Sequence, residues 1–207
     1  MCLLLLSFFQ LKGFTNTTVT FLGDSLTAGY QLSVEDAFPK QLEKLMGTSN
    51  ITAINRGISG DTSYTLLNRL AFSLIPTPDI AFIAIGANDG LRGMPLKNTK
   101  QNILKIIQHL KEKKINVILA GMTLPENYTQ TYISDFEQIY AELSKQTQTK
   151  LMPFLLIDVA GIPSLNLTDG IHPNKVGHQK IAESIFQFLK TENIISSKNQ
   201  WQMINQN

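Results

Sequence analysis

The chain has 207 residues, of which 43% are hydrophobic and 16% charged, and its formal net charge is +2. This length fits a single domain, and the composition excludes a disordered or fibrous protein. The balanced charge and the absence of a dense block of lysine and arginine argue against nucleic acid as a partner.

The first residues of the chain form a short apolar run, MCLLLLSFF. It has the length of the apolar part of a signal peptide and is too short for a membrane span of about 20 residues. No lysine or arginine precedes the run, and no A-x-A cleavage site follows it. We interpret residues 1–14 as an atypical export signal, which predicts a periplasmic or secreted protein. An N-terminal strand or helix that stays in the mature protein is the alternative.

Five apolar runs of strand length alternate with segments of helical periodicity in the rest of the chain. The runs cover residues 19–22, 51–54, 80–85, 117–120 and 151–157. Buried strands that alternate with amphipathic helices indicate a parallel sheet covered on both faces. We therefore predict a three-layer α/β/α sandwich with a flavodoxin-like, five-stranded parallel sheet over residues 15–195, and a polar tail at residues 196–207.

Polar motifs follow three of these strands, and a fourth lies near the C-terminus. They are GDSL at 23–26, NRGISGDTS at 55–63, GAND at 86–89 and DGIH at 169–172. Each has a structural alternative, since serine often caps a helix and glycine or Asn-Asp-Gly often forms a turn. Their joint occurrence favours a site, because parallel sheets collect functional residues beyond the carboxyl ends of their strands.

These motifs contain the parts of a serine hydrolase. A serine hydroxyl needs a base to become a nucleophile, and the base needs a partner that fixes its tautomer. Ser25, His172 and Asp169 can fill these roles, because one turn can hold an aspartate and a histidine three residues apart. The backbone N–H groups of Ser25 and Gly60 and the side-chain amide of Asn88 can form an oxyanion hole.

The four motifs resemble those of the SGNH or GDSL hydrolases, which are recognised by serine, glycine, asparagine and histidine in that order. The resemblance covers residues 19 to about 190. It implies Ser25 as nucleophile, Asp169 and His172 as the other triad members, and Gly60 and Asn88 in the oxyanion hole. The residues in and around the motifs are most similar to those of the bacterial acyl-CoA thioesterase, arylesterase and lysophospholipase group. This resemblance implies an enzyme that uses no metal or cofactor.

The α/β-hydrolase nucleophile elbow is excluded by its pattern G-x-S-x-G, since Thr27 stands two residues after the serine. We expect two segments beyond the strands to form an acyl pocket, although well-packed loops are the alternative. The residues expected to bind substrate are Asp89, Gly90, Leu91, Arg92, Leu124 and Pro125.

The sequence thus predicts a monomeric serine esterase or thioesterase that hydrolyses acyl esters of the acyl-CoA, lysophospholipid or aryl type through an acyl-enzyme. Two alternatives stay open. One is a carbohydrate O-deacetylase on the same scaffold, and the other is a catalytically silent binding module.

Overall fold

A computed structural model of the chain describes residues 16–47 and 50–195. Its centre is one sheet of five parallel strands in the order β2-β1-β3-β4-β5. The strands are β1 (Thr17–Gly23), β2 (Ile51–Gly57), β3 (Ile80–Ala84), β4 (Asn116–Ala120) and β5 (Lys150–Met152). The predicted five-stranded α/β fold is therefore confirmed.

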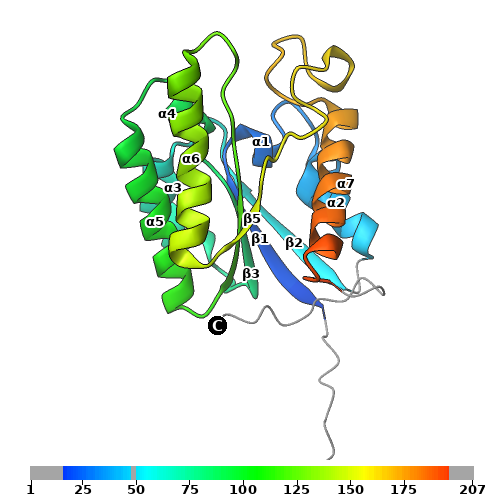
Figure 1. Cartoon of the computed structure of the whole chain (residues 1–207). Coiled ribbons are helices and arrows are strands. Elements are labelled where there is room, and N and C mark those ends of the chain that lie inside the picture. The colour runs from blue at the N-terminus through cyan, green and yellow to red at the C-terminus, as the bar shows by residue number, and fades with distance from the viewer. Residues whose placement is uncertain (1–15, 48–49, 196–207) are drawn as a thin grey trace, which may run out of the picture.

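Helices cover both faces of the sheet (Figure 1). One layer contains α2 (Phe38–Met46) and α7 (Lys175–Thr191), which pack against each other. The other contains α3 (Ser63–Ser73), α5 (Leu96–Glu112) and α6 (Gln130–Thr147), with α5 in contact with both neighbours. Two short helices, α1 (Ser25–Ala28) and α4 (Ala87–Leu91), follow directly after β1 and β3.

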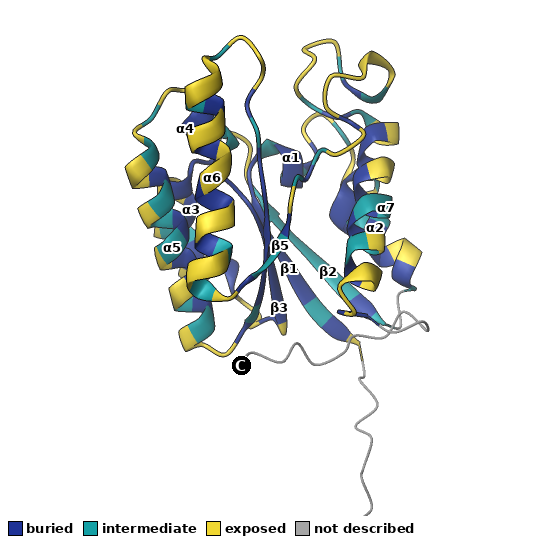
Figure 2. Ribbon diagram, in the orientation of Figure 1, coloured by how far each residue is buried: buried dark blue, intermediate teal, exposed yellow. Residues whose placement is uncertain are grey.

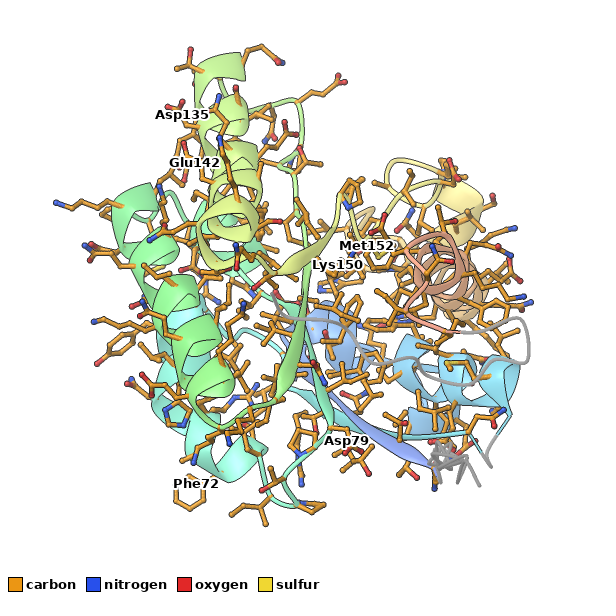
Figure 3. All side chains as sticks on the ribbon, turned by 60° about the horizontal axis from the view of Figure 1, so that its bottom comes forward. Phe72, Asp79, Asp135, Glu142, Lys150 and Met152 are labelled. Carbon is orange, nitrogen blue, oxygen red and sulfur yellow. The ribbon has the colours of Figure 1, made fainter. Side chains whose placement is uncertain are left out.

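The core lies between the sheet and these two layers, as the buried strands and inner helix faces of Figure 2 show. Every residue of β3 is buried. The predicted apolar face of α5 is also buried, including Ile103, Ile106 and Ile107. Among the described residues, the large apolar side chain with the highest exposure is Phe72 of α3, which is 78% exposed and projects away from the body of the molecule (Figure 3).

Two predicted segments have a different local structure. The fifth strand ends at Met152 instead of residue 157, because Pro153 has no N–H to donate to a neighbouring strand. The backbone N–H of Leu155 instead bonds the carbonyl of Gly121 at 3.0 Å, and turns follow. The segment after β3, predicted as a loop, begins as helix α4.

The predicted export segment (1–14) and the predicted polar tail (196–207) lie outside the described residues, as does residue 15. Across the described part of the chain, every helix is too short or too polar to cross a membrane.

Candidate active site

Ser25 is the first residue of α1, at the carboxyl edge of the sheet. Gly23, the last residue of β1, pairs with Gly57 of β2 and Ala84 of β3, so the ends of three strands meet there. Asp24 caps α1 by accepting the N–H of Leu26 on Oδ1 at 3.0 Å. This cap directs the chain out of the strand and presents Ser25 at the helix start. The N-cap is thus Asp24 and not the serine, which was the structural alternative considered from the sequence.

His172 and Asp169 approach Ser25 from the loop before α7. His172 Nε2 is 2.9 Å from Ser25 Oγ, and His172 Nδ1 is 2.8 Å from Asp169 Oδ2. Ser25 and His172 are 147 residues apart in the sequence, yet together with Asp169 they form one hydrogen-bonded chain. Such a chain can withdraw a proton from the serine hydroxyl, because the imidazole accepts it while the carboxylate holds the ring.

Asp169 also organises the turn on which it lies. Its Oδ1 accepts the backbone N–H groups of Ile171 at 2.9 Å and His172 at 3.0 Å. The His172 N–H is the main cause that lowers the pKa of Asp169 to about 2, with the Ile171 N–H adding to it. The carboxylate is therefore ionised at neutral pH, while its other oxygen stays available to the imidazole.

The loop that carries this pair is anchored at its base. Asn166 pairs with Pro173 in an antiparallel bridge, and Asn174 caps α7 by accepting the N–H groups of Val176 and Gly177. The side-chain amide of Asn174 also donates to the carbonyl of Ser164 at 2.9 Å. The backbone on both sides of His172 is therefore anchored, while its ring is held by Asp169 through Nδ1.

Gly60 lies in the turn after β2, beside the start of α1. The N–H of Ile58 bonds the carbonyl of Gly23 at 3.1 Å, which holds this turn against the end of β1. Gly57 allows the approach, since a Cβ there would lie 2.3 Å from the nitrogen of Ala28. Gly60 itself has a φ of 87°, a left-handed conformation that glycine adopts without strain.

Asn88, in the first turn of α4, is tied to the same turn. Its Nδ2 donates to the backbone carbonyl of Asp61 at 2.9 Å. A carboxamide has two N–H groups, so this bond leaves a second one for another acceptor. Asn88 and Ser25 both line the cavity that contains His172. The structure thus brings the predicted triad and Asn88 to one place, with the Gly60 turn beside them.

The model of the GDSL-like lipase/acylhydrolase family matches residues 21–180. The chain belongs to this family. An arylesterase of Vibrio mimicus is 41% identical over 171 residues, which cover 81% of this chain and 86% of that protein.

Two further family members are similar over most of their length. The thioesterase 1/protease 1/lysophospholipase L1 of Escherichia coli K12 is 37% identical over 167 residues, or 80% of each chain. The crystal structure of the psychrotrophic esterase EstA from Pseudoalteromonas sp., inhibited by monoethylphosphonate, matches with a TM-score of 0.81 and 32% identity. It covers 86% of this chain and 99% of that one. As a family member, this chain is a carboxylic ester hydrolase that acts on acyl esters.

The present protein has a cavity of about 780 Å³ next to Ser25 and His172. One wall is formed by residues between Met122 and Glu137, and the other by the loop from Phe154 to His172. These segments stand on either side of α1 in Figure 1. Much of the lining is apolar; the apolar residues include Leu26, Leu91, Leu124, Ile133, Phe154 and Leu156.

Of the six residues predicted to bind substrate, three line the cavity and three do not. Leu91, Leu124 and Pro125 line the cavity. Asp89 is buried away from it and accepts the N–H of Ser63 at 2.8 Å and the hydroxyls of Ser63 and Thr99. Gly90 is buried too, and Arg92 extends over the Gly60 turn. These three residues connect α4 to its surroundings and do not line the cavity.

Two contacts in this region were missed from the sequence. The centroid of the Tyr30 ring lies 4.4 Å from that of the His172 ring. The carbonyl of Asp61 accepts from Asn88. Tyr30 closes the GDSLTAGY stretch, so its proximity to Ser25 in sequence was the available signal. A backbone acceptor leaves no signal of its own in the residue type.

Asp24, next to the nucleophile, is a buried carboxyl group. Burial is the main cause that raises its pKa to about 7, and the charges of Asp61 and Asp89 raise it further. Its Oδ1 accepts the N–H of Leu26 in the cap of α1, so the side chain shapes the turn that presents Ser25. Within residues 16–47 and 50–195, there is no group of three histidine, cysteine, aspartate or glutamate side chains placed to hold a metal ion.

Proposed function

We propose that this esterase works through an acyl-enzyme on Ser25, with His172 as general base and Asp169 as the residue that orients it. The hydrogen-bonded chain from Ser25 Oγ through the imidazole to Asp169 is the observation that carries this proposal. The N–H groups of Ser25, Gly60 and Asn88 are the proposed oxyanion donors.

In the proposed reaction, Ser25 Oγ bonds to the acyl carbon while its proton passes to His172 Nε2. The carbonyl oxygen becomes an oxyanion and is stabilised by the three donors. The bond to the leaving alkoxide, phenoxide or thiolate then breaks, and His172 returns the proton to that group. A water molecule repeats the sequence on the acyl-enzyme, giving the free acid and restoring Ser25.

A fluorophosphonate tests the nucleophile directly, because its phosphorus bonds covalently to an activated serine oxygen with loss of fluoride. We expect stoichiometric labelling of the peptide that contains Ser25, read by mass spectrometry, together with loss of esterase activity. A phosphonate also inhibited the related EstA structure. Full activity in an unlabelled protein, or a label on another serine, would contradict the proposal.

The charges of the cavity support neutral esters as its preferred substrates. Among the residues that the structure describes, its lining includes Glu126 and Glu137 but no lysine or arginine. An acyl-CoA carries several phosphate charges, which these carboxylates repel, whereas an aryl or alkyl ester carries none. We therefore infer a preference for neutral aryl and alkyl esters over acyl-CoA, with the apolar wall holding the acyl chain.

Replacing both carboxylates tests this preference. In Glu126→Gln/Glu137→Gln, kcat/KM for butyryl-CoA relative to p-nitrophenyl butyrate should rise about threefold to tenfold, the range that exposed charges allow. In the unmodified protein, the difference in kcat/KM between butyryl-CoA and p-nitrophenyl butyrate should also decrease with added salt. Glu112→Gln, an exposed change on α5 outside this cavity, is the matched control. An unchanged ratio would show that these carboxylates do not select the substrate.

The two alternatives from the sequence make different predictions. A carbohydrate O-deacetylase would act on acetylated xylan or glucosamine and not on p-nitrophenyl octanoate. The apolar lining favours the acyl chain instead. A silent binding module would leave every ester intact, which the assembled triad argues against.

We also propose that the protein is exported to the periplasm or secreted, and that it works as a monomer. The apolar run within residues 1–14 supports export. Sequencing the mature N-terminus tests this, and a mature chain that begins at Met1 would contradict it. The cavity and triad are complete within one chain, which supports activity as a monomer, and sedimentation of the active protein measures that state.

A further inference from the structure

Arg92 connects the turn that carries Gly60 to helix α4, which carries Asn88; both are proposed oxyanion donors. It follows the last residue of α4, and its Nη2 lies 3.1 Å from the carbonyl oxygen of Gly60 and 3.4 Å from Oδ1 of Asn88. One amino group of a guanidinium has two hydrogens, so a single Nη2 can serve both acceptors. Arg92 is exposed and does not line the cavity, so it contacts Gly60 and Asn88 from outside the cavity.

The bond to Asn88 bears on which way its carboxamide points. The terminal torsion of asparagine is broad and roughly two-fold, so the amide needs partners to select one orientation. Arg92 donates to Oδ1, and Nδ2 donates to the carbonyl of Asp61. A flip would place two donors beside the guanidinium and turn an acceptor toward the oxyanion. The pair of bonds therefore keeps an N–H of Asn88 available to the substrate.

The bond to Gly60 bears on the other donor. The Gly60 turn is exposed, and glycine there has a wide choice of backbone conformations. Its carbonyl is held by Arg92, and the next carbonyl, that of Asp61, is held by Asn88. Two successive carbonyls of the turn are thus tied to α4 and the residue that follows it, which limits the movement of the turn that carries the Gly60 N–H.

We propose that Arg92 is a positioning residue for the oxyanion hole, which aligns Gly60 and Asn88 without touching the substrate. The inference rests on the proposed function. Preorganised donors stabilise a developing oxyanion because they need no rearrangement during the reaction. Loosening them should therefore lower kcat, while KM, which reflects binding of the uncharged ester, should change little.

The main test replaces Arg92 by methionine, which keeps an apolar stem of similar length but removes both bonds. We expect kcat on p-nitrophenyl butyrate to fall about tenfold to thirtyfold, less than the 10²–10³-fold cost of deleting a whole donor. KM should stay within about twofold, and phosphonate inactivation should slow in parallel with kcat/KM. Arg92→Lys should recover part of the loss, since an ammonium group reaches fewer acceptors in a fixed geometry.

Arg56→Met is the matched control, because Arg56 also donates to a backbone carbonyl, that of Ile75, and lies outside the cavity lining. We expect this control to keep kcat within about twofold, as for sites that do not share partners with the reaction. Thermal denaturation of both variants checks that a loss in Arg92→Met does not follow from unfolding.

A double-mutant cycle with Asn88→Ala separates the two proposals. Asn88→Ala alone should lower kcat about 10²-fold or more, and Arg92→Met should then cost less in that background than alone, because one of its targets is gone. Normal turnover by Asn88→Ala would contradict the proposed oxyanion hole itself. A slow Asn88→Ala with unchanged kcat in Arg92→Met, an effect on KM alone, or full additivity would overturn only the role of Arg92.

Discussion

Replacing Ser25 by alanine is expected to lower kcat/KM on p-nitrophenyl butyrate by about 10⁴-fold to 10⁶-fold, as loss of the nucleophile does in other serine hydrolases. The variant has no oxygen to bond to the acyl carbon, so no acyl-enzyme forms. The residual rate comes from substrate held near the proposed oxyanion donors. Steady-state kinetics give the loss, and the fluorophosphonate should no longer label the protein.

The fold should not change in this variant, since the cap of α1 depends on the Asp24 side chain and not on the serine hydroxyl. Equal thermal denaturation of both proteins would show this. Ser134→Ala is the matched control, because Ser134 is exposed on α6 and does not line the cavity. An unlabelled Ser25→Ala that kept a tenth of the activity would mean that another group is the nucleophile.

Asp169→Asn is expected to have the second-largest effect, a loss in kcat of about 10³-fold to 10⁴-fold. The asparagine Oδ1 can still accept the N–H groups of Ile171 and His172, so the turn should persist. Its Nδ2, however, would donate toward His172 Nδ1 where the carboxylate accepted. The imidazole would then carry its proton on Nε2 and could not accept one from Ser25.

The pH dependence of this pair follows from the pKa of Asp169, which its backbone hydrogen bonds lower to about 2. The carboxylate stays ionised from about pH 4 upward, so its support for His172 is constant through the neutral range and declines only as the pH falls toward that pKa. Asp169→Asn should therefore lower activity at every pH between about 5 and 9 by a similar factor.

Asp158→Asn, an exposed change in the same loop, is the control for Asp169→Asn and should keep wild-type kinetics. Its backbone is left-handed, with a φ of 60°, which asparagine tolerates well. If Asp169→Asn retained more than about a tenth of wild-type kcat with its fold intact, the proposed tautomer role would be wrong.

The strands and helices that build the sheet could be predicted because each depends on a local pattern. Buried parallel strands such as β3 are continuous apolar runs, and α5 repeats its apolar residues at helical spacing. The residues directly after such strands meet at one edge, so the positions of Ser25 and Asn88 at that edge followed from the strand ends. The boundaries of β5 did not follow, because apolar residues also fill the turns after Pro153.

The sequence by itself thus determined the fold class, the family, and which residues are candidates for the site, since residue types and their order along the chain carry that information. Only the tertiary structure decided how neighbours in sequence divide their roles. Asp89 is turned into the interior by Ser63 and Thr99, while Asn88 beside it faces the cavity. Arg92 bonds Gly60, 32 residues away, because the end of α4 meets the turn after β2 there. Such contacts depend on how elements pack, and a linear pattern records residue types without recording which side of a helix each one faces.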